Sequence, residues 1–238
     1  MDNEIAKKPF VLGISPARGG SKGIPRKNLI DLCGKPLLAH TIEQSLNAKT
    51  LSDYLVNSED EEIRTVAESY GAKTMSRPDM YAHDQILQEV DLLLKWTVEE
   101  YEKQNPDIHV DVVVLLYPTA PLRGTQAIDS CVRMVVEDGF DTALTLYSDS
   151  TYLWRIGDDG KSCAATNYDP NNRMPRQKEN WNQWAENKAV YATRRDVLFS
   201  IGRVGPKCGF VEMEKWRSID IDEPVDLEIA RAILCHNP

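Results

Sequence analysis

A short segment near the N-terminus combines three glycines with four cationic side chains. Residues 15–28 read SPARGGSKGIPRKN, contain Arg18, Lys22, Arg26 and Lys27, and follow the apolar run FVLGI. Glycine lets the backbone approach an anion closely, successive N–H groups form anion-binding concavities, and arginine binds two phosphate oxygens at once. Loops that follow strands of an α/β sheet bind ligands at its carboxyl edge. The segment therefore predicts a site for a nucleoside triphosphate, and the alternative is a solvated glycine turn.

The glycine spacing excludes two common phosphate-binding motifs. The P-loop pattern GxxxxGK[ST] is absent, because Gly19, Gly20, Ser21 and Lys22 follow one another in a different order. The dinucleotide pattern GxGxxG is absent too, because the glycine pair is followed by Gly23. A hydride-transferring dinucleotide enzyme is therefore not expected.

A second segment, residues 217–227 (RSIDIDEPVDL), contains two closely spaced aspartates. Strand alternation would place the two isoleucines on one face and Asp220 and Asp222 on the other. Two neighbouring carboxylates repel each other unless a cation lies between them, and Mg²⁺ suits one or two carboxylates together with phosphate oxygens. The alternative is that Asp222 caps a helix that begins at Pro224. Because the sequence also predicts a triphosphate-binding loop, a metal site is the better interpretation of the two aspartates.

Between these two segments, apolar runs alternate with helical patterns. Apolar and β-branched runs predict strands at residues 10–15, 53–58, 110–117 and 141–147. Apolar residues at helical spacing predict helices at residues 36–48, 60–72, 84–103 and 125–137. The alternation returns after residue 186 with a strand and helix at 187–200, a strand at 210–213 and a closing helix at 224–234. This order predicts an α/β fold with a Rossmann-like, mostly parallel sheet and helices on both faces.

Residues 148–186 interrupt this alternation. The segment is polar and rich in turn residues, and two of its tryptophans, Trp181 and Trp184, look exposed. We interpret it as an arm inserted into a single domain that spans residues 1–238. One function of such an arm is a dimer interface with the tryptophans as anchors.

Composition limits the partners. The 238 residues carry a net charge of −9, and the sequence pI is about 5.0. An acidic chain does not favour nucleic acid or an anionic membrane, and no apolar run is long enough to cross a bilayer. The N-terminus lacks the apolar stretch of a signal peptide. Five scattered cysteines without a CxxC pair favour reduced thiols in the cytoplasm over disulfides or a zinc site.

Four motifs resemble the CMP-sialate synthetase family, the acylneuraminate cytidylyltransferases, which belong to the sugar-activating nucleotidyltransferases. They are PARGGSKGIPRKNL, GKPLLAHTI, YPTAPLR and SIDIDEPVDL, and the resemblance extends from Ile14 to Leu227. It implies a nucleotidyltransferase-type fold, a homodimer, a Mg²⁺ cofactor and a reaction between CTP and a 2-keto sugar acid. The products would be a CMP-sugar and pyrophosphate.

The resemblance also implies roles for individual residues. The nucleotide would contact Arg18, Gly19, Ser21, Lys22, Lys27, Asn28, Asn57, Ser58, Arg77 and Asp84, with Arg77 at the cytosine edge. Asp220 and Asp222 would bind the metal, and Arg18, Lys22 and Asp222 would be catalytic. In this scheme the anomeric hydroxyl of the sugar attacks the α-phosphorus in line, and Asp222 assists the loss of the hydroxyl proton.

The acceptor side departs from the family pattern. Tyr117 stands where the family has glutamine, and AENKAVY replaces RPNGAIY, so that Ala185 replaces an arginine and Lys188 a glycine. The acceptor candidates are Tyr117, Thr119, Arg123, Arg173, Arg176, Gln177, Asn187 and Tyr191. Lys188 either brings a charge toward an anionic acceptor or points into solvent. Alternative acceptors are a phosphonate or a keto-deoxyoctulosonate-like acid, and another alternative is a nucleotide-binding module without turnover.

Overall fold

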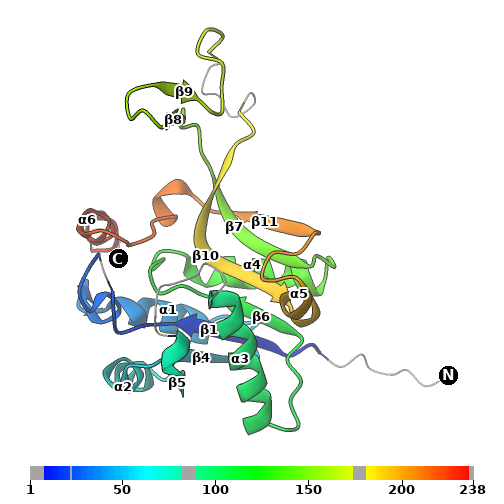
Figure 1. Cartoon of the computed structure of the whole chain (residues 1–238). Coiled ribbons are helices and arrows are strands. Elements are labelled where there is room, and N and C mark those ends of the chain that lie inside the picture. The colour runs from blue at the N-terminus through cyan, green and yellow to red at the C-terminus, as the bar shows by residue number, and fades with distance from the viewer. Residues whose placement is uncertain (1–7, 22, 82–88, 174–180, 236–238) are drawn as a thin grey trace, which may run out of the picture.

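The computed structural model describes residues 8–21, 23–81, 89–173 and 181–235. The main sheet contains β1 (Val11–Pro16), β4 (Asp53–Ser58), β5 (Lys73–Ser76), β6 (Val112–Leu115), β7 (Thr142–Ser148), β10 (Trp184–Arg194) and β11 (Cys208–Glu212). Its strand order is β11-β7-β10-β6-β1-β4-β5 (Figure 1). The α-helices are α1 (Leu37–Leu46), α2 (Glu61–Ser69), α3 (Glu89–Gln104), α4 (Gly124–Val136), α5 (Arg195–Ser200) and α6 (Pro224–Leu234).

The sheet is parallel except at β10, which runs antiparallel to both of its neighbours, β6 and β7. The other pairs, β1 with β4 and β6, β4 with β5, and β7 with β11, are parallel. The prediction of a mostly parallel α/β sheet is confirmed. The antiparallel β10 is a feature that the apolar runs did not reveal.

Alternating side chains of the central strands face two apolar cores. One core combines Val112 and Val114 of β6 with residues of α1, α2 and α4. The other combines Val113 and Leu115 of the same strand with residues of α3 and α5. Because successive side chains of a strand point to opposite faces, the apolar run of β6 fills both cores, and the helices cover both faces as predicted.

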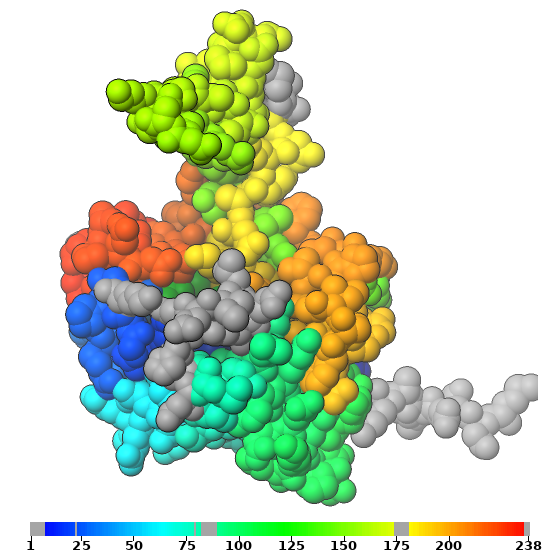
Figure 2. Space-filling model, viewed as in Figure 1, coloured from blue at the N-terminus to red at the C-terminus, as the bar shows by residue number. Residues whose placement is uncertain are grey.

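A third, smaller core connects residues 15–28, the glycine loop, with residues 217–227, the aspartate segment. Ile24 from the glycine loop packs with Ile221 and with Leu227 of α6, and all three side chains are at most 5% exposed. The hairpin of β2 (Asp31–Leu32) and β3 (Lys35–Pro36) contributes Leu32 to the same core. In Figures 1 and 2 the blue part of the chain that follows β1 accordingly lies beside the red α6. Apolar packing thus brings residues 15–28 and 217–227 together.

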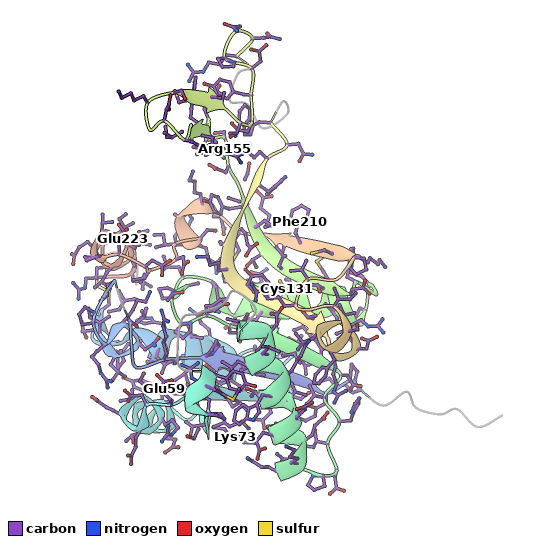
Figure 3. All side chains as sticks on the ribbon, viewed as in Figure 1. Glu59, Lys73, Cys131, Arg155, Phe210 and Glu223 are labelled. Atoms are coloured by element: carbon purple, nitrogen blue, oxygen red, sulfur yellow. A yellow bond between two sulfur atoms is a disulfide. The ribbon has the colours of Figure 1, made fainter. Side chains whose placement is uncertain are left out.

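Residues 149–173 and 181–183 lie outside the sheet and form a projecting arm (Figures 1 and 2). Its hairpin consists of β8 (Trp154–Ile156) and β9 (Cys163–Ala165), and Figure 3 shows Arg155 there, far from Glu223 at the start of α6. Trp181 is only 8% exposed and stacks edge-on against Tyr152. The expectation that Trp181 is exposed is therefore wrong, because aromatic packing within the arm buries it.

Cys33 and Cys235 form a disulfide that joins the β2–β3 hairpin to the end of α6. The expectation that all five cysteines are reduced is wrong for this pair. The two residues are 202 positions apart, so only the packing of α6 against the hairpin brings them together. Cys131, Cys163 and Cys208 are free. Among the described residues, no helix combines the length and apolar character needed to span a bilayer.

We expect Cys235→Ser to lower the free energy of unfolding by about 2–4 kcal/mol under oxidising conditions, since the cross-link closes a very long loop. The measurement is urea unfolding with and without reductant. Reduced wild type should match the variant, and Cys208→Ser, which removes a free thiol, should behave like wild type in both conditions. Equal stability of oxidised wild type and Cys235→Ser would contradict the structural role of the bond.

Candidate active site

A cavity of about 580 Å³ lies where β1 and β6 end and β10 begins. The glycine loop lines it through Arg18, Lys27 and Asn28, and the aspartate segment lines it through Asp220 and Asp222. Four other predicted residues also line the cavity, namely Arg77, Tyr117, Thr119 and Tyr191. The structure therefore brings together nine of the residues that the sequence singled out, at the carboxyl edge of the sheet.

The glycine loop is attached directly to the aspartate segment. Lys27 Nζ donates to Asp222 Oδ1 at 2.9 Å and to the carbonyl oxygen of Ile221 at 2.7 Å. A Cβ at Gly23 would collide with the carbonyl oxygen of Asp222, so the close approach of the two segments requires glycine there. Asn28 is buried, and its amide donates to the carbonyl of Arg18 at 2.9 Å. These bonds fix the shape of the loop around the cavity.

Glu59 connects the loop to Arg77. The backbone N–H of Gly19 donates to Glu59 Oε1 at 2.7 Å, and Arg77 Nε donates to Glu59 Oε2 at 2.7 Å. Arg77 is only 6% exposed, and Figure 3 labels Glu59 after the end of β4. A side chain at Gly19 would collide with Asp60. The carboxylate of Glu59 therefore holds both a loop N–H group and the guanidinium at the cavity wall.

The aspartate segment is not a strand of the sheet, so it does not have the strand structure from which the alternation of its side chains was predicted. The alternation of faces nevertheless holds. Ile221 is fully buried, and its N–H donates to the carbonyl of Thr119 at 2.8 Å, while Asp220 and Asp222 face the cavity. Partial burial favours a higher pKa for Asp222, but the hydrogen bond and charge of Lys27 outweigh it and lower that pKa.

Asp222 is not the cap of α6. The cap residue is Glu223, whose side chain and that of Asp226 form a reciprocal capping box with the first turn of the helix. Pro224 occupies the first helical turn, as expected. Asp222 is therefore not required for capping, and its carboxylate bonds to Lys27 and faces the cavity.

The two aspartates suit a divalent cation. Within the described residues, no group of three or more histidine, cysteine or acidic side chains is arranged to hold a metal. Asp220 and Asp222 do share one cation, since Lys188 Nζ lies 2.8 Å from Asp220 Oδ2 and 3.7 Å from Asp222 Oδ2. Mg²⁺ commonly uses one or two carboxylates and completes its shell with water and phosphate oxygens. The pair therefore fits Mg²⁺ when a triphosphate supplies further ligands.

Another part of the cavity lining is aromatic and cationic. Tyr117 and Tyr191 meet edge to face with ring centroids 6.3 Å apart, and the Tyr191 hydroxyl donates to Glu186. Burial raises the pKa of Tyr117. Arg203 also lines the cavity and donates to Asp91 Oδ1 at 2.8 Å. Sequence reasoning missed Arg203, because it follows α5 in a turn without a motif.

Several predicted residues do not line the cavity. Arg123 is fully buried and donates to the backbone oxygens of Ala189 and Tyr117 and to Thr41 Oγ1. Asn187, Asn57 and Ser58 are also buried. Gly19 and Ser21 belong to the loop, and Arg173 lies in the arm, 4.2 Å from the ring centroid of Tyr152. Lys22, Asp84, Arg176 and Gln177 fall outside the described residues.

A mostly parallel sheet with a cationic glycine loop and a carboxylate pair at its carboxyl edge defines an α/β protein of nucleotidyltransferase type. Residues 12–200 match the family model described as cytidylyltransferase, and the chain belongs to this family. The resemblance to the CMP-sialate synthetases is confirmed, since relatives of that kind match over most of the chain.

N-acylneuraminate cytidylyltransferase of Escherichia coli is 30% identical over 232 residues, which cover 94% of this chain and 52% of the relative. Pseudaminic acid cytidylyltransferase of Campylobacter jejuni is 45% identical over 111 residues, 47% of each chain. The chain spans about half the length of the curated N-acylneuraminate cytidylyltransferases that it matches. CMP:2-keto-3-deoxy-manno-octonic acid synthetase, solved in complex with CTP, superposes with a TM-score of 0.68 at 17% identity. That match covers 96% of this chain and all of the solved one and shows the shared fold.

Proposed function

We propose that this cytidylyltransferase is Mg²⁺-dependent and transfers CMP from CTP to a 2-keto sugar acid of the nonulosonate type, releasing pyrophosphate. The observation that carries the proposal is the attachment of the glycine loop to the aspartate pair, with Lys27 donating to Asp222 at the edge of one cavity. Triphosphate and metal would thus meet at a single place. The relatives that act on N-acylneuraminate and pseudaminic acid support the acceptor class.

The residues that line the cavity would have different roles in an in-line displacement. Arg18, Lys27 and the N–H groups of the loop would hold the triphosphate and neutralise the charge that develops on the leaving pyrophosphate. The acceptor hydroxyl attacks the α-phosphorus, the bond to the bridging oxygen of pyrophosphate breaks, and Asp222 takes up the hydroxyl proton. Asp220 and Asp222 would hold Mg²⁺, which supplies electrostatic stabilisation of the phosphoryl oxygens when bound.

Arg77 would bind the cytosine edge. We expect Arg77→Met to raise the Kd for CTP about 10- to 100-fold, the cost of losing charge-assisted hydrogen bonds. Calorimetric titration with CTP is the measurement. Arg64→Met is a control, because Arg64 lies on nearby α2 and bonds the backbone oxygen of Ser58 without lining the cavity. Equal CTP affinity in Arg77→Met and wild type would remove Arg77 from the nucleotide site.

The acceptor is tested by pyrophosphate release with CTP, Mg²⁺ and a panel of N-acetylneuraminate, pseudaminate, legionaminate, keto-deoxyoctulosonate and small phosphonates, with product masses recorded. We expect a CMP adduct with one nonulosonate. An adduct formed only with keto-deoxyoctulosonate or a phosphonate would replace the acceptor class. CTP binding without any pyrophosphate release would favour a nucleotide-binding module. A homodimer and a cytoplasmic location also remain proposals, which light scattering and cell fractionation would test.

A further inference from the structure

β10 is irregular where it passes the cavity. Its pairing with β7 jumps from Glu186 opposite Leu146 to Tyr191 opposite Leu144, so residues 187–190 lie opposite Thr145 alone. Bulges of this kind re-aim side chains and are common beside active sites. This bulge turns the chain so that Lys188, at its tip, lines the cavity.

Lys188 has a backbone conformation that lysine rarely adopts. Its φ is 55°, in the left-handed region where the Cβ atom crowds the backbone. Buried groups on both sides enforce this conformation. Asn187 Oδ1 accepts from Thr145 Oγ1 at 2.6 Å and from the N–H of Ala189 at 3.1 Å, and buried Arg123 donates to the carbonyl of Ala189. Enforced strain of this kind is concentrated at functional sites.

The left-handed backbone conformation of Lys188 places its ammonium group next to the two aspartates. Lys188 Nζ lies 2.8 Å from Asp220 Oδ2 and 3.7 Å from Asp222 Oδ2. Asn187 also donates to Ser218 Oγ at 2.9 Å, so the bulge is bonded to the aspartate segment itself. Lys27, another cation that lines the cavity, bonds the other carboxylate oxygen of Asp222. The ammonium of Lys188 is thus the group between the two carboxylates.

We propose that Lys188 is an intramolecular cation that occupies the metal position between Asp220 and Asp222 and competes with the divalent ion for it. The inference rests on the proposed function, which assigns these aspartates to the metal. A metal ion that enters must displace the ammonium and tolerate its charge nearby. Lys188 therefore weakens metal binding in the absence of nucleotide and keeps the carboxylate pair compensated until the metal arrives.

The test is direct binding of Mn²⁺ to the full chain without nucleotide, measured by electron paramagnetic resonance of free Mn²⁺. We expect Lys188→Met to bind Mn²⁺ about two- to fivefold more tightly than wild type, the upper part of the range that corresponds to losing a partly exposed ion pair. Lys188→Gly should show the same gain in Mn²⁺ affinity. Because this variant also removes the backbone strain, an equal gain in both variants assigns the effect to the lost charge. Lys215→Met removes a matched charge at Asp149, outside the cavity, and should leave the affinity unchanged.

Asp222→Asn in the Lys188→Met background identifies the site, because it should abolish the gained Mn²⁺ affinity. Unchanged or weaker Mn²⁺ binding in Lys188→Met and Lys188→Gly would overturn the inference. Tighter binding that persists after Asp222→Asn would overturn it as well, because the ion would then lie elsewhere. Turnover reports separately on the proposed function. If wild type makes a CMP-sugar but Lys188→Met binds Mn²⁺ no more tightly than wild type, the competition between Lys188 and the metal is refuted and the proposed function still stands.

Discussion

Asp222→Asn should lower kcat for CMP transfer about a hundredfold to a thousandfold at saturating Mg²⁺, the usual cost of removing one electrostatic contact to the transition state. The carboxylate has two assigned tasks, holding the metal and accepting the hydroxyl proton, and the amide can do neither well. The pKa of Asp222 is lowered in the folded protein despite partial burial, because Lys27 bonds it, so the carboxylate is ionised at neutral pH.

The substitution should leave the fold intact. The side chain of Asp222 is 59% exposed, and α6 is capped by Glu223 and Asp226 instead. We therefore expect an unchanged melting temperature within about 2 °C. Glu228→Gln is the matched control, since it neutralises an exposed carboxylate on α6 that pairs with Arg231, and its kcat should equal that of wild type. Full turnover by Asp222→Asn at saturating Mg²⁺ would remove this residue from the mechanism.

Arg123→Met should lower the free energy of unfolding by about 3–5 kcal/mol, since each buried acceptor left unpaired costs about 1–3 kcal/mol. The guanidinium is fully buried and donates to the backbone oxygens of Ala189 and Tyr117 and to Thr41. Burial lowers the pKa of Arg123 to about 10, so the group is still charged at neutral pH. Methionine fills much of the volume but satisfies none of the three oxygens.

Urea unfolding measures this loss, and Arg133→Met on the exposed face of the same helix α4 is the control. The control should change stability by less than about 0.5 kcal/mol. Equal losses in Arg123→Met and Arg133→Met would contradict a bracing role for Arg123. Because Arg123 bonds the backbone oxygens of Tyr117, which lines the cavity, and of Ala189, which follows the cavity residue Lys188, residual folded enzyme should also show a raised KM for the acceptor.

Local sequence patterns predicted most of the fold. Helical spacing placed a helix at residues 125–137, and the structure has it at Gly124–Val136. The closing helix from Pro224 to Leu234 was predicted with its observed bounds. Glycines, cations and paired aspartates also identified two segments that meet at one cavity. These features are encoded within single segments, where periodicity and turn chemistry are decisive.

Other features depend on contacts between distant segments. Whether an arginine faces a ligand or lies buried is decided by the elements around it, so Arg123 could not be assigned from YPTAPLR alone. The Cys33–Cys235 disulfide and the place of Arg203 likewise follow from packing. The bulge at Lys188 had one local signal, since lysine stands where the resembled pattern has glycine, a residue that adopts positive φ freely.

In the proposed reaction the α-phosphorus of CTP is attacked and pyrophosphate leaves. Label transfer tests it most directly, with CTP carrying ³²P at the α position in one reaction and at the γ position in another. With the preferred acceptor and Mg²⁺, we expect α label in the sugar nucleotide and γ label in pyrophosphate. Recovery of γ label in the sugar, or of α label in free CMP without a sugar nucleotide, would contradict it.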